Sequence, residues 1–176
     1  MSRTGFRGLA WLAVLLLSAC ATPAPQPLPH LAAVPASFEM SGRLAVRQGD
    51  RSEIARLRWT HHPASDVWVF ASPLGNEVAR IESSAAGATM AQAGSDPQSA
   101  PSFAALSEKF LGVALEPTTL AAWLHGGAQS GIPGDWQVTL DEMQQAGAVA
   151  LARKISAVRG DVVVRLVVDE YRALVE

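Results

Sequence analysis

The sequence predicts a mainly β domain with two helices, folded as one curved antiparallel sheet or open barrel under a helical cover. Two observations predict this fold class. Apolar and polar residues alternate from residue 37 onward and again after residue 135, with the period of two that is typical of half-buried strands. Between these regions, residues 102–125 change to the spacing of amphipathic helices.

Five strands are expected before the helices. In the first strand, Phe38, Met40 and Leu44 alternate with polar or small neighbours, and Gln48-Gly49-Asp50-Arg51 supplies the turn that follows. Pro73-Leu74-Gly75-Asn76 is a second turn sequence, in which a large apolar residue, Leu74, stands among turn-forming residues. The expected strands span residues 38–47, 54–59, 66–72, 77–83 and 87–92.

Two short helices and a second group of strands follow. Residues 102–111 place apolar side chains on one helical stripe, with Ser102 as the N-cap and Gly112 as the stop. Residues 118–125, after Pro117, form a second stripe. Later strands are expected at residues 135–140 and 161–170, whereas residues 148–157 fit either a strand or a helix.

The strands at 66–72 and 161–170 are apolar on both faces, which exceeds what a simple two-layer core needs. A sheet that curls around a cavity under a helical lid would use both faces. An ordinary filled core remains the alternative for any single apolar residue.

Residues 1–19 are typical of a secretory signal peptide. Arg3 and Arg7 precede the apolar run at residues 9–17, and small residues follow it. At about 1.5 Å per residue, this run is too short to cross a hydrocarbon core of about 30 Å as a helix.

The lone cysteine lies at the expected cleavage point. Leu17-Ser18-Ala19-Cys20 resembles the lipobox of bacterial lipoprotein precursors. The resemblance implies that Cys20 carries a diacylglycerol and an N-acyl chain, with no other cofactor, and multiple chains give stable anchoring. Ala21 stands where an aspartate would retain an enterobacterial lipoprotein in the inner membrane, which implies the outer membrane. A free cysteine at the end of an ordinary signal is the alternative.

Residues 20–36 are expected to form the lipidated N-terminus and a tether rich in Pro and Ala, followed by the folded domain at 37–176. Five of the eleven prolines lie between residues 21 and 36, which favours an extended spacer. The formal charge of −2 becomes −4 when the signal is removed with its two arginines. This acidic balance argues against a nucleic-acid partner, because binding phosphates needs a clustered basic face.

No enzyme motif is present in the sequence. It contains no Gly-x-Ser-x-Gly, P-loop or His-Glu-x-x-His pattern. His61 and His62 would point to opposite faces of a strand, so they are interpreted as surface residues at a strand end rather than metal ligands. His125 stands alone at a helix end and is expected to bind a terminal helix carbonyl or to interact with the helix dipole. We therefore expect no metal and no catalytic residue, although an enzyme built from scattered residues stays open.

Several segments, in their order along the chain, resemble the LolB family of outer-membrane lipoprotein receptors. The resemblance covers roughly residues 37–172 and rests on several short motifs behind the lipobox. The motifs are FEMSGRLAV at 38–46, Arg58-Trp59, Ser72-Pro73-Leu74-Gly75, LAAWLHG at 120–126, DWQV at 135–138 and the run from Leu151 to Tyr171.

The resemblance implies an unclosed antiparallel barrel with helices over an apolar acyl-chain cavity. It also implies a monomer that is anchored in the outer membrane, faces the periplasm, takes lipoprotein cargo from a LolA-type carrier and inserts it into outer-membrane lipid. In the family, the leucine of the Pro-Leu-Gly loop is tied to membrane insertion, and here it is Leu74. The residues expected to line the cavity are Leu44, Val46, Leu57, Trp59, Phe70, Ile81, Met90, Phe110, Leu120 and Trp123.

The chain departs from the family pattern at a few positions. Gly126-Gly127-Ala128 replaces Gly-Leu-Pro, and the region 141–150 is short. Leu140 stands where an aromatic residue is usual, and Tyr171 stands where a late tryptophan is common. Two other functions remain open: a structural or assembly lipoprotein of the outer membrane with a filled core, and a lipid shuttle that faces the periplasm.

Overall fold

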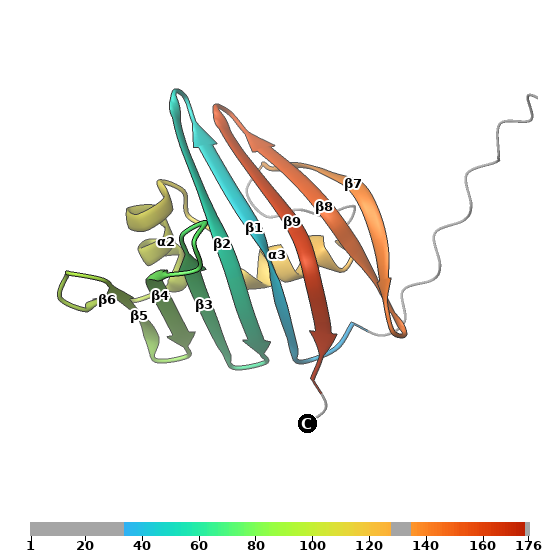
Figure 1. Ribbon diagram of the computed structural model, residues 1–176, viewed down its shortest axis with the longest axis horizontal. Coiled ribbons are helices and arrows are strands. Elements are labelled where there is room, and N and C mark those ends of the chain that lie inside the picture. Colours follow the sequence, from blue (N-terminus) through green and yellow to red (C-terminus); the bar gives the residue numbers. More distant parts are fainter. Residues whose placement is uncertain (1–33, 128–134, 175–176) are drawn as a thin grey trace, which may run out of the picture. The chain divides into compact units, whose positions relative to one another are not determined.

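In the computed structural model, which describes residues 34–127 and 135–174, the chain forms one nine-stranded antiparallel sheet. The strand order is β6-β5-β4-β3-β2-β1-β9-β8-β7, so β1 and β9, from opposite ends of the domain, are neighbours at the centre. The sheet is strongly curved, and the two helices α2 and α3 lie on one side of it (Figure 1). All of these elements belong to one compact unit, Leu31–Glu176.

The expected strands are present, and most are longer than predicted. β1 and β2 form a long hairpin around Gly49, and the ambiguous segment 148–157 is a strand rather than a helix. β6 was not expected from the sequence. The strands are β1 (Phe38–Gln48), β2 (Arg51–His62), β3 (Ser65–Ala71), β4 (Glu77–Ser84), β5 (Gly87–Gln92), β6 (Gln98–Ala100), β7 (Gln137–Ala146), β8 (Val149–Arg159) and β9 (Val162–Ala173).

The two helices begin and end close to the expected residues. In α2 (Phe103–Leu111), the Ser102 hydroxyl accepts a hydrogen bond from the Ala105 amide, and Gly112 ends the helix in the left-handed conformation. α3 (Pro117–Leu124) starts with proline at its first turn, where no amide hydrogen is needed. Helices this short are marginal alone, so the sheet that they cover stabilises them.

The core lies between the helices and the concave face of the sheet. Alternate side chains of each strand enter it, as the period of two predicts. On β3, Trp68 and Phe70 face the helices, where Trp68 packs edge-on against Phe103 at a ring-centroid distance of 4.6 Å. Val69, on the opposite face of β3, is also buried, so this strand does use both faces.

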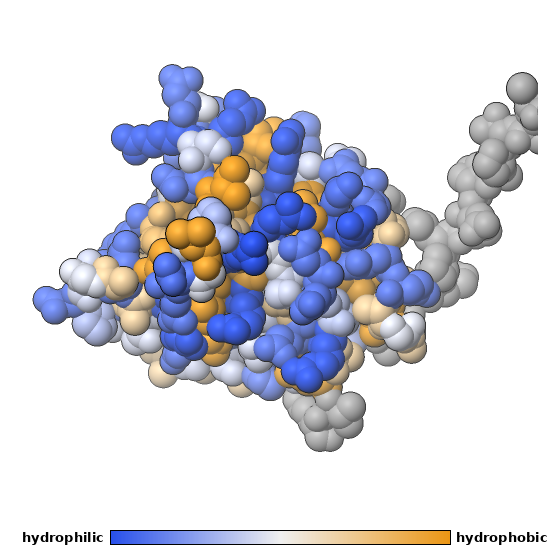
Figure 2. All heavy atoms as spheres, viewed as in Figure 1, coloured by the Kyte–Doolittle hydropathy of each residue, from blue (hydrophilic) through white to orange (hydrophobic). Residues whose placement is uncertain are grey.

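The outer, convex face of the sheet is mainly polar. Alternating residues such as Arg43, Arg56 and Arg165 are exposed there. Figure 2, which views the domain from the side away from the helices, shows a largely hydrophilic surface interrupted by a few apolar side chains. The concave face is therefore the place where a buried apolar ligand could lie.

β1 and β9 approach each other unusually closely at Gly42. The register between the two strands shifts between Ser41 and Gly42, which marks a β-bulge. A Cβ atom added at Gly42 would lie 2.1 Å from the carbonyl oxygen of Val167. Only glycine fits at this point of the central strand pair.

Candidate functional site

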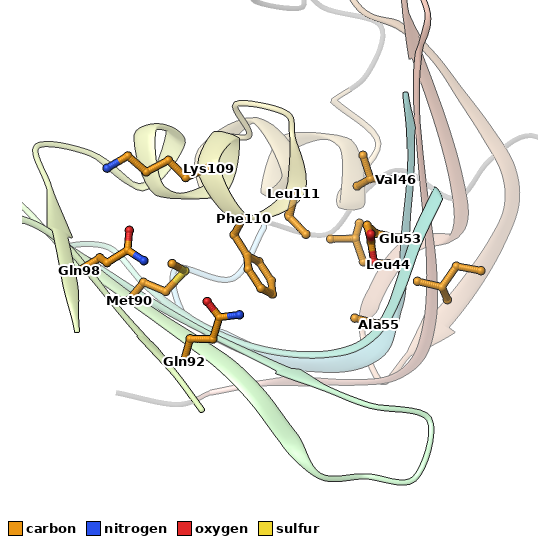
Figure 3. Close-up of a pocket in the computed structure, with 11 residues that line it drawn as sticks. Leu44, Val46, Glu53, Ala55, Met90, Gln92, Gln98, Lys109, Phe110 and Leu111 are labelled. Carbon is orange, nitrogen blue, oxygen red and sulfur yellow. The ribbon is translucent and has the colours of Figure 1, made fainter. Parts of the chain in front are cut away.

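A cavity of about 420 Å³ lies between the C-terminal end of α2 and the concave face of the sheet. Figure 3 shows Phe110 pointing from the helix into this space, with the strands curving around its other side. The lining residues come from β1, β2, β5, β6 and α2. They are Leu44, Val46, Glu53, Ile54, Ala55, Met90, Gln92, Gln98, Lys109, Phe110 and Leu111.

The cavity has an apolar floor and a polar rim. Leu44, Val46 and Met90 are buried at its base. Exposed polar side chains, Gln98 and Lys109 among them, stand where the cavity meets solvent. This division suits an amphiphile, whose apolar part enters while its polar end stays at the surface.

Helix α2 sets the shape of the cavity through Phe110. Phe103, Leu106 and Leu111 are buried against the sheet, which fixes the rotation of the helix. Phe110 then falls at the edge of this contact, half-buried, with its ring centroid 5.1 Å from that of Phe70. One side of its ring faces the core and the other faces the cavity.

The ten residues expected to line a cavity divide into two groups. Leu44, Val46, Met90 and Phe110 line the cavity described above. The others are closely packed in the core, with at most 3% of their surface exposed. These core residues are Leu57, Trp59, Phe70, Ile81, Leu120 and Trp123.

Sequence reasoning missed Ala55, which lies in the cavity wall on β2. It occupies the inward position two residues before Leu57, where a large side chain would have filled the space. A small residue at an inward position of a strand otherwise occupied by Leu and Trp is the signal that could have found it.

The loop between β3 and β4 presents Leu74 to solvent. The turn is closed by two backbone hydrogen bonds of 2.8 Å, from the Ser72 amide to the Asn76 carbonyl and from the Gly75 amide to the Ser72 carbonyl. Gly75 has a φ of 91°, which L-residues rarely adopt. Leu74 at the tip is 89% exposed, the largest value among the exposed large apolar side chains described.

His125 and Tyr171 form a polar pair at the other end of the core. His125 Nδ1 lies 2.8 Å from the Ala121 carbonyl, and Nε2 lies 2.8 Å from the Tyr171 hydroxyl. A carbonyl only accepts, so Nδ1 carries the proton and the tyrosine donates to Nε2. Burial lowers the pKa of His125 and raises the pKa of Tyr171 to about 12, so both groups stay neutral at pH 7. The expectation that His125 binds a helix carbonyl is confirmed.

His61 is not the surface residue expected from the sequence. Its ring packs 4.9 Å from that of Phe38, and Nδ1 lies 2.7 Å from Asp66 Oδ1. The Trp59 indole also donates to Asp66, at 2.7 Å. The strand end was expected to be solvated, but the first residues of β1 cover it. Nowhere in residues 34–127 and 135–174 do three His, Cys, Asp or Glu side chains come close enough to hold a metal ion.

Cys20 and most of the expected tether lie outside the described residues. Within the described part of the chain, neither helix is long and apolar enough to cross a membrane.

Comparison with known proteins places the sequence in a family. Residues 36–171 match the family model of the outer membrane lipoprotein LolB. An outer-membrane lipoprotein LolB of Azoarcus sp. (strain BH72) is 30% identical, with 98% of each chain covered. A protein of the same name from Cupriavidus taiwanensis is 33% identical over 85% of this chain and 75% of its own.

Among solved structures, a DUF1329 family protein from Desulfovibrio piger superposes with a TM-score of 0.51. The match covers 81% of this chain and 88% of that one, at 9% sequence identity. At this identity, the likeness supports the fold alone.

Proposed function

The chain belongs to the LolB family of outer-membrane lipoproteins, and we propose that it accepts lipoproteins from a LolA-type periplasmic carrier and inserts them into the outer membrane. In this proposal the acyl chains of the cargo occupy the cavity between α2 and the sheet. Cys20, lipidated, holds the receptor at its target membrane.

The observation that carries the proposal is the cavity with its apolar floor and polar rim. Its volume of about 420 Å³ lies within the usual range of ligand pockets, about 300–1,000 Å³. Leu44, Val46 and Met90 offer only apolar atoms to a ligand at the base. Acyl chains would be held there while the protein part of the cargo stays outside.

Handover between cavities needs no covalent chemistry. Each methylene taken out of water is worth about 0.8 kcal/mol, so free acyl chains would leave a carrier for the periplasm very slowly. Two cavities docked mouth to mouth let the chains slide across without meeting water. The bilayer is a still better apolar phase, so release into it runs downhill.

Leu74 supports the second step of the proposed function, the delivery of cargo into the membrane. An 89% exposed leucine on a closed turn buries almost nothing in the protein itself. Entry into lipid would gain about 1.5–3 kcal/mol. The loop would therefore bring the receptor into contact with the bilayer that takes the cargo.

Filling the cavity tests whether it holds acyl chains. Ala55→Phe places a ring in the space beside Leu44 without replacing a packed core residue. If two methylenes of a ligand are excluded, about 1.6 kcal/mol is lost, or about fifteenfold in Kd. The measurement is the binding of a fluorescent fatty acid to the chain from Ala21 onward, which contains the whole compact unit.

Ala45→Phe is the matched control, because Ala45 is half-buried on the convex face of the neighbouring strand. It is expected to bind the probe like the wild type. Equal binding by the Ala55→Phe variant would place the acyl-chain site elsewhere. No binding by the folded wild type would favour the structural-lipoprotein alternative.

A further inference from the structure

Beside the Leu74 loop, the convex face of the sheet has a groove of about 250 Å³ bordered by two arginines. Arg56 and Arg58 alternate with the core residues of β2 and are both exposed. The floor of the groove is formed by Val69 and Ala71 of β3, which pair with Arg58 and Arg56, and Gly75 of the loop lies at its edge. We call Arg56, Arg58 and Leu74 the loop-side patch.

The two arginines of the patch have no ion-pair partner among the described residues. Arg43, the cross-strand neighbour of Arg56, is paired with Asp169 at 3.2 Å, so Asp169 is already used although it borders the same groove. Glu170, nearby on β9, accepts a hydrogen bond of 3.4 Å from Ser41.

The position of Arg56 opposite another arginine does not favour the stability of the sheet. Arg43 and Arg56 stand directly opposite each other, and like charges in this position destabilise a sheet. The ion pair of Arg43 with Asp169 reduces this repulsion but leaves Arg56 without a partner of its own in the described part of the chain. The chain carries this unfavourable pair although its overall charge is negative. A binding role for the unpaired guanidinium groups explains why they gather beside the most exposed leucine of the described residues.

We infer that the loop-side patch docks on anionic phospholipid headgroups, with Leu74 inserted among the acyl chains while Arg56 and Arg58 bind headgroup phosphates. This inference rests on the proposed delivery of cargo to a membrane, and names the lipid chemistry and the face that meets it. A guanidinium group binds phosphate through two parallel hydrogen bonds, and a leucine beside it supplies the apolar contact.

The proposed orientation is compatible with the anchor and with the helices. Between Cys20 and Phe38 the chain is rich in proline and would span roughly 50 Å when extended, which leaves the domain room to turn. Arg56 and Arg58 lie on the convex face of β2, and α2 and α3 lie on the other side of the sheet (Figure 1). Docking would therefore leave the helical side of the domain uncovered.

The test compares vesicles of phosphatidylcholine alone, which are zwitterionic, with vesicles that also contain one quarter phosphatidylglycerol. The chain from Ala21 onward is expected to sediment with the anionic vesicles and to leave them as salt rises to about 0.5 M, because exposed charges are screened. Arg56→Gln combined with Arg58→Gln is expected to weaken this binding about tenfold or more, since each arginine near an anionic surface contributes several-fold.

Arg153→Gln combined with Lys154→Gln is the matched control. It removes the same two charges from β8, which lies three strands from β2 in the sheet. Among the described residues, both side chains pair with Glu142, unlike the two arginines of the loop-side patch. Because the net charge changes by the same amount in both double variants, the control tests whether net charge alone determines vesicle binding. It is expected to bind anionic vesicles like the wild type.

A second readout separates this inference from the proposed function. Both double variants are expected to accept labelled lipoprotein from a loaded carrier in solution at the wild-type rate. If the Arg56/Arg58 variant binds anionic vesicles as tightly as the wild type and accepts cargo normally, the inferred docking of the loop-side patch is wrong, whereas the proposed receptor function stands. If the variant accepts cargo more slowly but binds vesicles like the wild type, the inferred docking is also wrong, because the patch would then contact the carrier protein instead of lipid. If the wild type accepts no label, the proposed function itself fails.

Discussion

Replacing Leu74 with glutamate is expected to slow the delivery of cargo into membranes strongly, while folding and acceptance of cargo continue. Leu74 is 89% exposed, so the substitution removes almost no contact within the protein. It removes about 1.5–3 kcal/mol of apolar transfer into lipid, which corresponds to a slowing of about tenfold to a hundredfold. The measurement is the movement of a labelled lipoprotein from the lipidated receptor into vesicles.

Leu74→Met is the control for this substitution. Methionine keeps an apolar side chain of similar size at the tip of the turn, and delivery is expected to stay within a few-fold of the wild type. The same hydrogen-bonded turn, from Ser72 to Asn76, supports both variants. Delivery by Leu74→Glu at the wild-type rate would show that the loop has no part in insertion.

Replacing Gly42 with alanine is expected to cost about 3 kcal/mol or more of the free energy of unfolding. The new Cβ would lie 2.1 Å from the carbonyl oxygen of Val167, a backbone atom that cannot move without separating β1 from β9. These strands pair at the centre of the sheet, so the strain reaches the core on both sides. Urea unfolding followed by tryptophan fluorescence measures the loss.

Gly49→Ala is the matched control, since it makes the same replacement in the turn between β1 and β2. Gly49 has a φ of 55° but nothing within 4 Å of an added Cβ, so only the backbone conformation is penalised, by about 1 kcal/mol. Equal losses in the two variants would mean that the close approach at Gly42 relaxes without cost.

Much of the fold could be predicted because alternation and capping act locally. Strand β1 follows from its period of two, and helix α2 follows from Ser102 and Gly112, whose roles the structure confirms. The segment now seen as β8 could not be decided, because Ala-rich sequences fit a helix equally well until the neighbouring β9 pairs with it. Strand β6 is three residues long and exists through its pairing with β5, which leaves no periodic signal.

The candidate site was less predictable than the fold. Alternation shows which residues face inward, and all the expected cavity residues on strands do so. The alternation does not show which part of the sheet the helices pack against. Trp59 and Phe70 face inward but are covered, whereas Met90 borders the open space near the end of α2. The difference depends on where α2 ends, which is a tertiary property.

The loop leucine was identified through a family resemblance, and its exposure now has a structural cause. Two backbone hydrogen bonds close the turn from Ser72 to Asn76 and hold Leu74 at its tip. Sequence reasoning assigned no role to the arginines beside it. Arg56 and Arg58 become neighbours of the loop only through the register of β2 with β3.

The measurement that tests the central claim most directly is cargo transfer in solution. The chain from Ala21 onward is mixed with a LolA-type carrier from the same organism, loaded with a labelled lipoprotein. The label is expected to move onto this chain, driven by a cavity that holds the acyl chains more favourably than the carrier does. If the label stays on the carrier while this chain is folded, the receptor function is contradicted and a structural role in the outer membrane takes its place.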